Sequence, residues 1–361
     1  MLYYYPATAL DQNWLNPKII EVLLCGMDAI DAGGDPADWP DCIPVGRREV
    51  LRPRYGFRDK LSDIWQSYRG LTDEQKQDAR AAIGHQTNLP DVLFNDGPCT
   101  RISDLPAAFV KASRDLFEYM FGQLTTLKVG GECIRDAQYR AIYTEISERI
   151  CPFCGLNYFR APGAPRTALD HFMPISLYPF VGSDLRNLAP ACDECNSSFK
   201  GTSDVLWADT GARRRCSDPY GGPVYRVDLS GSPLFSGNEV RGTRLPLWQI
   251  ELVDGPPEQA DAWNTIFKIK ERYIRDVLDA DFISWMEHFA RWFDRESGRG
   301  KSADEVAAEL PRYINNVVQD GLADRAFLKA EAFRLVLAGC NDPDDGEDVR
   351  AWLWGFVEYA V

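Results

Sequence analysis

The stretch that decides the fold is built on two cysteine pairs, Cys151-Pro-Phe-Cys154 and Cys192-Asp-Glu-Cys195, with 37 residues between them. A Cys-x-x-Cys turn brings two thiolates to one side of a tight bend, and two such turns supply the four sulfur ligands that Zn²⁺ accepts in a tetrahedron. Because protein ligands then fill all four positions, we expect a structural zinc ion that holds the loops together. The alternative is a set of reduced thiols or a redox pair.

Side chains suited to a second, harder metal ion lie between and directly after the cysteine pairs. Asp170 and Asn196 offer the oxygen ligands that Mg²⁺ or Mn²⁺ prefers. The neighbouring His171, with an ordinary pKa of about 6.5, can take a proton from water at neutral pH. Together these groups suffice for metal-assisted hydrolysis of a phosphodiester. The alternatives are a hydrogen-bonded core histidine, a carboxylate that only orients it, and an asparagine that only caps a helix.

The order of these elements resembles a known motif. Asp170-His171, then Asn187-Leu-Ala-Pro, then Cys195-Asn196-x-x-x-Lys200-Gly201 are similar to the HNH endonuclease motif of the ββα-metal nucleases, over roughly residues 135–201. The resemblance implies two short strands and a helix around one divalent ion. It implies His171 as general base, Asp170 and Asn196 as metal ligands, and Asn187 as the residue that holds the loop and orients His171. The last motif position is Asn, which makes this an H-N-N variant.

A weaker resemblance concerns the chain after the motif. Asp218-Pro219-Tyr220 and the segment from Trp263 to Tyr273 look like features of larger bacterial HNH proteins. Many of those belong to phage-defence or ATPase-linked systems. The resemblance therefore suggests antiviral defence or DNA processing as the context, with a partner protein such as an ATPase or sensor subunit.

The charge is unevenly distributed along the chain. The net charge of -14 argues against a protein that only coats nucleic acid. Residues 134–226, however, carry 11 Lys and Arg against 10 Asp and Glu, so the acidity lies in the flanks. We expect the flanks to dock a partner protein or to restrain the nuclease. The residues predicted to contact phosphate are Arg160, Arg166, Lys200, Arg213, Arg214 and Arg215, the alternative being a merely solvated basic run.

Apolar periodicity predicts helices on both sides of the motif. One stripe, with Ser103 as its expected cap, comprises Phe109, Ser113, Leu116, Phe117, Met120 and Leu124, and another runs from Tyr139 to Ile150. Alternating residues near 225–229 and 248–252 predict strands. The expected fold is mainly α with a small ββα core stapled by zinc, α+β overall. The expected regions are 1–130, helical, for regulation or docking; 131–230, the nuclease core; and 231–361, helical.

The sequence contains no apolar run near the ~20 residues that a membrane span needs, and its first residues show no signal-peptide pattern. We therefore expect a cytoplasmic protein without membrane association. The predicted function is metal-dependent cleavage of DNA. The alternatives are a non-catalytic, zinc-stapled interaction or scaffold module, and a nuclease that cleaves RNA, for which the chain shows no recognisable RNA-binding module.

Overall fold

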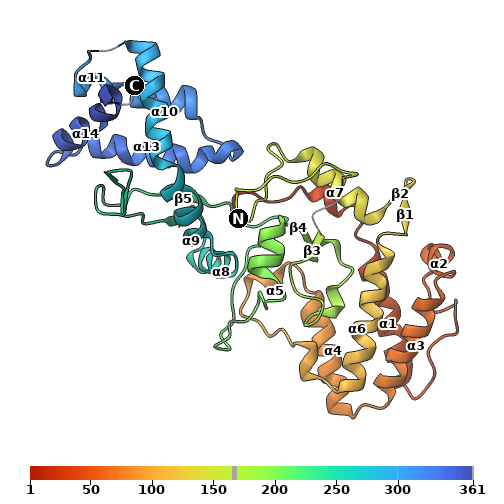
Figure 1. Ribbon diagram of the computed structural model, residues 1–361. Helices are drawn as coiled ribbons and strands as arrows, with labels where there is room; N and C mark the ends of the chain where they lie inside the picture. The colour runs from red at the N-terminus through yellow and green to blue at the C-terminus, as the bar shows by residue number, and fades with distance from the viewer. Residues whose placement is uncertain (165–168, 299, 360–361) are drawn as a thin grey trace. The chain divides into compact units, whose positions relative to one another are not determined.

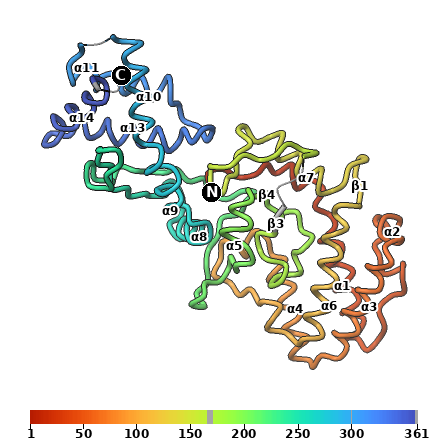
Figure 2. Tube along the Cα trace, in the orientation of Figure 1, coloured from red at the N-terminus to blue at the C-terminus, as the bar shows by residue number. Residues whose placement is uncertain are grey.

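The computed structural model describes residues 1–164, 169–298 and 300–359 (Figure 1). The chain is mainly helical, with a few short strands. It divides into two compact units. Figure 2 colours the chain by residue number, from red at the N-terminus to blue at the C-terminus. The first comprises Met1, Tyr3–Phe153 and Tyr158–Pro223; the second comprises Leu2, Cys154–Asn157 and the chain from Val224 onward. Among the described residues, no helix combines the length and the apolar character needed to span a membrane.

The first unit is a helical body that carries two short antiparallel strand pairs. The pairs are β1 (Lys128–Val129) with β2 (Glu132–Cys133), and β3 (Leu169–His171) with β4 (Leu188–Pro190). The α-helices are α1 (Leu15–Asp31), α2 (Val45–Leu51), α3 (Tyr55–Arg69), α4 (Asp73–Thr87), α5 (Asp91–Phe94), α6 (Ala107–Gln123) and α7 (Ile134–Glu145). Shorter helices are η1 (Ala7–Leu10), η2 (Ile102–Asp104), η3 (Pro179–Val181), η4 (Leu185–Asn187) and η5 (Glu194–Lys200).

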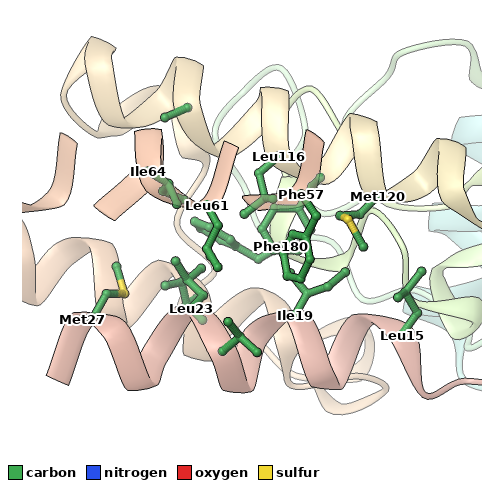
Figure 3. Packing of buried hydrophobic residues seen from close by; sticks show 14 of the residues in the cluster. Leu15, Ile19, Leu23, Met27, Phe57, Leu61, Ile64, Leu116, Met120 and Phe180 are labelled. Atoms are coloured by element: carbon green, nitrogen blue, oxygen red, sulfur yellow. The ribbon is translucent and has the colours of Figure 1, made fainter. Parts of the chain in front are cut away.

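The core of the first unit lies where α1, α3 and α6 meet (Figure 3). Phe180, from η3, packs into it and contacts the rings of Phe109 (centroids 6.4 Å apart) and Phe117 (5.5 Å apart) on α6. All three phenylalanines are fully buried. Burial of a phenylalanine side chain stabilises a fold by roughly 1.5–3 kcal/mol. The segment that was expected to form the nuclease core thus shares its hydrophobic core with the N-terminal helices.

This shared core changes the expected domain organisation. The predicted boundary between residues 130 and 131 does not separate two compact units, because Ile134, Leu185 and Leu188 belong to the same buried cluster as the helices before them. A boundary does lie at Pro223, seven residues before the predicted one at 230. Apolar periodicity reveals which face of a helix is buried but not which other segment covers it.

The stripe on α6 is confirmed in full, because its six predicted residues are all fully buried. The predicted cap is wrong: Ser103 lies in η2, and α6 begins after Pro106 without a side-chain cap. A residue before proline is disfavoured in the helical region, and Leu105 is accordingly extended. Similarly, α7 ends at Glu145 rather than continuing to Ile150, which instead forms a bridge with Tyr158.

The second unit contains the predicted strands and the C-terminal helices. The strands form two antiparallel pairs, β5 (Arg226–Asp228) with β8 (Glu251–Val253) and β6 (Glu239–Val240) with β7 (Thr243–Arg244). The helices are α8 (Pro257–Phe267), α9 (Ile269–Tyr273), η6 (Ile274–Leu278), α10 (Asp279–Ser297), α11 (Ala303–Ala308), α12 (Leu310–Tyr313), η7 (Ile314–Val318), η8 (Ala323–Arg325), α13 (Ala326–Cys340) and α14 (Gly346–Tyr359). A capping box formed by Ser302 and Glu305 starts α11.

Candidate functional site

The four cysteines of the two Cys-x-x-Cys pairs come together as predicted. Their Sγ atoms all lie within 4.8 Å of one another, and all four residues are buried. In a tetrahedral zinc site with Zn–S bonds of about 2.3 Å, the sulfur atoms lie about 3.8 Å apart. The cluster therefore has the ligand type, number and spacing for a structural metal ion such as zinc.

Backbone amides around the cluster favour thiolates over thiols. The N–H of Cys192 donates to Sγ of Cys151 (3.4 Å), and the N–H of Cys195 donates to Sγ of Cys192 (3.5 Å). The N–H of Leu156 donates to Sγ of Cys154 (3.4 Å), in a turn that Gly155 completes with a φ of +66°. Such second-layer hydrogen bonds orient metal ligands and stabilise their negative charge.

Strands β3 and β4 lead directly into the second cysteine pair. Asp170 pairs with Ala189 and His171 with Leu188 in antiparallel register, and η5 begins two residues after Cys192. Two strands and a helix thus follow one another along the chain. The side chain of Asp170 lies outside the part of the structure that is described, as does the whole of Arg166.

His171 stands at the end of β3 with its ring held on two sides. Its Nε2 lies 2.8 Å from the carbonyl oxygen of Gly182, and its ring centroid lies 4.4 Å from that of Phe121 on α6. A carbonyl oxygen can only accept, so Nε2 carries the hydrogen and Nδ1 keeps a lone pair. Burial lowers the pKa of His171 to about 4; the Gly182 bond opposes this shift, while the charges of Lys200 and Arg135 add to it. The imidazole is therefore neutral at neutral pH.

Asn187 fastens the loop between His171 and β4. Its side chain is 1% exposed; its Oδ1 accepts from the N–H of Met173 (2.7 Å), and its Nδ2 donates to the carbonyls of Met173 (3.0 Å) and Val181 (3.2 Å). Met173 lies two residues after His171, and Val181 lies next to Gly182. One amide group therefore joins the segment that carries the imidazole to the segment that carries its hydrogen-bond acceptor.

Two helices outside the motif hold the same loop, and sequence reasoning missed both contacts. Asn16 on α1 donates through Nδ2 to the carbonyl of Phe180 (2.9 Å) and accepts through Oδ1 from the hydroxyl of Ser183 (2.9 Å). Gln86 on α4 accepts from the N–H of Phe180 (3.2 Å). Both amide side chains are buried. A polar residue within an apolar helical face is the only signal that sequence offers for such an anchor.

The Asp218-Pro219-Tyr220 segment supports β4 through a hydrogen bond to its backbone. The Tyr220 hydroxyl donates to the carbonyl of Leu188 (2.5 Å), which also accepts from Nε2 of Gln138 (3.1 Å). Asp218 is 2% exposed and forms an ion pair with Arg186; burial raises its pKa, although this cation opposes the shift. The resemblance in sequence pointed to this segment, and the structure shows it to be a support for the strand pair.

The remaining predicted site residues differ in exposure to solvent. Asn196 is half-buried in η5, and its carbonyl accepts from the N–H of Gly201 (2.7 Å). Lys200 is only 3% exposed, and its Nζ donates to the carbonyl of Gly201 (3.2 Å). Arg160 is half exposed and lies 3.7 Å from Asp193. A contact between Lys200 and a substrate phosphate stays a prediction, one that the burial of Lys200 does not favour.

The basic run Arg213-Arg214-Arg215 is engaged within the fold. Arg213 donates to the carbonyls of Leu206 (3.0 Å) and Val92, and Arg214 donates to those of Asp204 (2.7 Å) and Trp207 (2.9 Å). Arg215 forms an ion pair with Asp96. These bonds occupy the guanidinium groups of Arg213 and Arg214, so phosphate binding by this run stays a prediction that the contacts do not favour.

Comparison with models of protein families, with curated proteins and with solved structures finds no match for this chain.

Proposed function

We propose that this chain is a metal-dependent HNH-type endonuclease that hydrolyses phosphodiester bonds of DNA. The observation that carries the proposal is the setting of His171. Its imidazole is neutral, its Nε2 is bonded to Gly182, and its supporting loop is held by Asn187 at the end of a strand pair that leads into the cysteine cluster. This arrangement agrees with the general base, the orienting asparagine and the strand–strand–helix order that the HNH motif implies.

In the proposed reaction, Nδ1 of His171 takes a proton from a water molecule while the oxygen of that water forms a bond to phosphorus. The bond from phosphorus to the leaving oxygen breaks, and solvent returns a proton to that oxygen. The oxygen donors of Asp170 and Asn196 have the chemistry to hold Mg²⁺ or Mn²⁺, which would stabilise charge on the phosphate and on the leaving oxygen. The low pKa of His171 keeps its lone pair available at neutral pH.

The test is cleavage of plasmid DNA with Mg²⁺, Mn²⁺, Ni²⁺ or EDTA by the parent chain, by His171→Ala and by a matched control, His85→Ala. His85 is also half-buried, but it lies on α4 and its Nδ1 contacts Thr100 (3.4 Å). We expect metal-dependent cleavage by the parent and the control, and a loss of about 10²-fold or more in His171→Ala. Equal cleavage by parent and His171→Ala would refute the proposed general base.

The second candidate function is a non-catalytic scaffold, and the cysteine cluster by itself favours it as much as it favours a nuclease. Elemental analysis should find about one zinc ion per chain in both cases. A scaffold would show no cleavage with any divalent ion, and its function would survive His171→Ala.

RNA as a substrate is tested by adding RNA in place of plasmid DNA in the same cleavage assay. A role in bacterial defence, a partner such as an ATPase or sensor subunit, and a cytoplasmic location are proposals that rest on the sequence alone. Deleting residues 1–130 is not a usable test of regulation. Such a deletion removes α1 and α6, and therefore strips the core that surrounds Phe180.

A further inference from the structure

A strongly basic segment lies in the first unit, far along the chain from the HNH-like motif. Residues 45–60 contain six Lys and Arg against two Asp and Glu, in a chain whose net charge is -14. The segment forms α2, a short turn and the first turns of α3. An isolated basic stretch in an acidic protein marks a surface that attracts anions.

The segment presents its charges to solvent together with an aromatic ring. The side chain of Arg52 is 63% exposed, that of Arg58 is 46% exposed, and Tyr55 is 62% exposed. The Arg58 guanidinium lies 5.2 Å from the centroid of the Tyr55 ring. An exposed aromatic ring flanked by arginines is the combination that stacks unpaired bases and binds the adjoining phosphates.

The carboxylates of this surface only partly neutralise it. Arg52 lies 3.9 Å from Glu49 and Arg58 lies 2.8 Å from Asp59, and both pairs are solvent-exposed. Arg48, on the side toward the core, pairs with Asp41. Within the described ranges, three further cations of the segment pair with no carboxylate: Arg47, whose guanidinium lies 4.1 Å from the Trp14 ring, Arg54 and Lys60.

The basic segment is anchored to the end of α6 that also supports His171. Arg54 donates to Oε1 of Gln123 (3.0 Å) at the last residue of α6 and to the hydroxyl of Thr126 (3.3 Å) just beyond it. Gln123 lies two residues after Phe121, whose ring contacts His171. Gly56 sits so close to the Tyr119 ring that a Cβ there would lie 2.6 Å from it. The basic segment and the His171 ring therefore both contact residues near the C-terminal end of α6.

We propose that the surface formed by Arg52, Tyr55 and Arg58 binds the phosphate backbone of the nucleic acid that the His171 centre cleaves, with Tyr55 stacking on an unpaired base. This inference rests on the proposed function and adds to it a substrate-binding surface that the HNH-like motif does not contain. Nucleic acid is favoured over an acidic membrane surface because the exposed aromatic lies beside arginines, and because Arg54 joins the segment to the end of the helix whose Phe121 contacts His171.

The test measures binding of fluorescent duplex and single-stranded DNA by anisotropy, without added divalent ions, in the His171→Ala chain. The patch variant adds Arg52→Gln and Arg58→Gln. Its control adds Arg241→Gln and Arg275→Gln, which remove the same charge from exposed positions of the second unit (72% and 56%). We expect the patch variant to bind duplex roughly tenfold more weakly at low salt, with the slope of log K against log salt reduced by roughly 2.

Tyr55→Ala is expected to weaken binding of single-stranded DNA by roughly tenfold and binding of duplex much less, while Tyr55→Phe restores binding. Equal losses in the patch and control variants would overturn the inference, because they would reflect net charge alone. Unchanged binding in the patch variant would overturn it as well. The inference would also be overturned if the patch variant lost binding to vesicles containing phosphatidylserine but kept binding to DNA.

The two proposals fail in distinguishable ways. If the parent cleaves DNA in a His171-dependent manner, and the patch substitutions placed in the parent chain change neither binding nor cleavage, the surface is wrong and the nuclease stands. If the patch is required for DNA binding but no divalent ion supports cleavage, the surface stands and the nuclease is wrong.

Discussion

Two arginine-rich segments of the first unit have opposite environments. In residues 213–215, the guanidinium groups of Arg213 and Arg214 bond to backbone carbonyls inside the fold. In residues 45–60, Arg52 and Arg58 reach solvent beside an exposed tyrosine. The compact run attracts attention in the sequence, whereas the dispersed one has the accessible charge. Charge density along a chain therefore does not reveal which cations reach solvent.

The largest expected difference between the two segments is in the loss of stability when an arginine is replaced by alanine. Replacing Arg213 by Ala removes a donor for each of the carbonyls of Leu206 and Val92. Leu206 keeps the hydrogen bond from the N–H of Arg214 (2.7 Å), but the charge-assisted hydrogen bonds of Arg213 to both carbonyls are lost. We therefore expect the free energy of unfolding in urea to fall by about 2–3 kcal/mol. Arg213→Lys should recover only part of the loss, since an ammonium group cannot reproduce the guanidinium fork. A loss no greater than that of Arg52→Ala would contradict the structural role of Arg213.

An intermediate effect, and one that depends on pH, is expected at Asp31. Burial raises the pKa of Asp31, but hydrogen bonds from Tyr68 (2.8 Å), Lys76 (3.0 Å) and Arg80 (2.8 Å) outweigh it and hold the pKa below its usual range. A lowered pKa in the folded state stabilises the fold above the unfolded pKa of about 3.9, and that stability is lost as the pH falls through the folded value.

Because Asp31 is about a third exposed, we expect Asp31→Asn to cost less than about 1 kcal/mol at pH 7. Urea titrations at several pH values would measure the free energy of unfolding of parent and variant. We expect the two values to become equal in strongly acidic solution. The cost of Arg213→Ala should change little over the same range, since its carbonyl partners do not titrate. A cost of Asp31→Asn that is constant with pH would show that the carboxylate charge is not what stabilises this network.

The smallest stability effect is expected for the exposed segment. Arg52→Gln and Arg58→Gln should each change the free energy of unfolding by no more than about 0.5 kcal/mol, because exposed charges contribute little to stability. Thermal unfolding monitored by circular dichroism would check this. A larger loss would mean that these cations support the fold and are not available for a substrate.

Much of the local structure could be predicted from sequence. The stripe from Phe109 to Leu124 correctly predicted the buried face of α6, and the alternation near residues 225–229 and 248–252 predicted strands where β5 and β8 lie. That these two strands pair with each other is a finding of the structure. The spacing of the four cysteines correctly predicted a cluster able to hold a metal ion. The helix and strand features depend on residues a few positions apart. The cysteine cluster depends on two Cys-x-x-Cys turns, each of which brings its two sulfur atoms together.

The supports of the candidate site could not be predicted in the same way. Asn16 and Gln86 are separated from the loop they hold by 164 and 94 residues, and their neighbours in sequence do not reveal which segment each amide will bond. The motif named His171 and Asn187 as partners, but it did not identify Phe121 or Gly182, which contact the imidazole directly. Such contacts arise only when separate helices close on one core.

The amino-acid sequence by itself determined the buried face of α6, the strands β5 and β8 and the clustering of the four cysteines, because periodicity and ligand spacing act over short distances. Only the tertiary structure decided that the N-terminal helices share a core with the motif, and that Arg213 is held inside the fold while Arg52 is exposed. The physical reason is that burial and hydrogen-bond partners depend on which segments pack together, and a packing choice made in one place determines which charges remain accessible elsewhere.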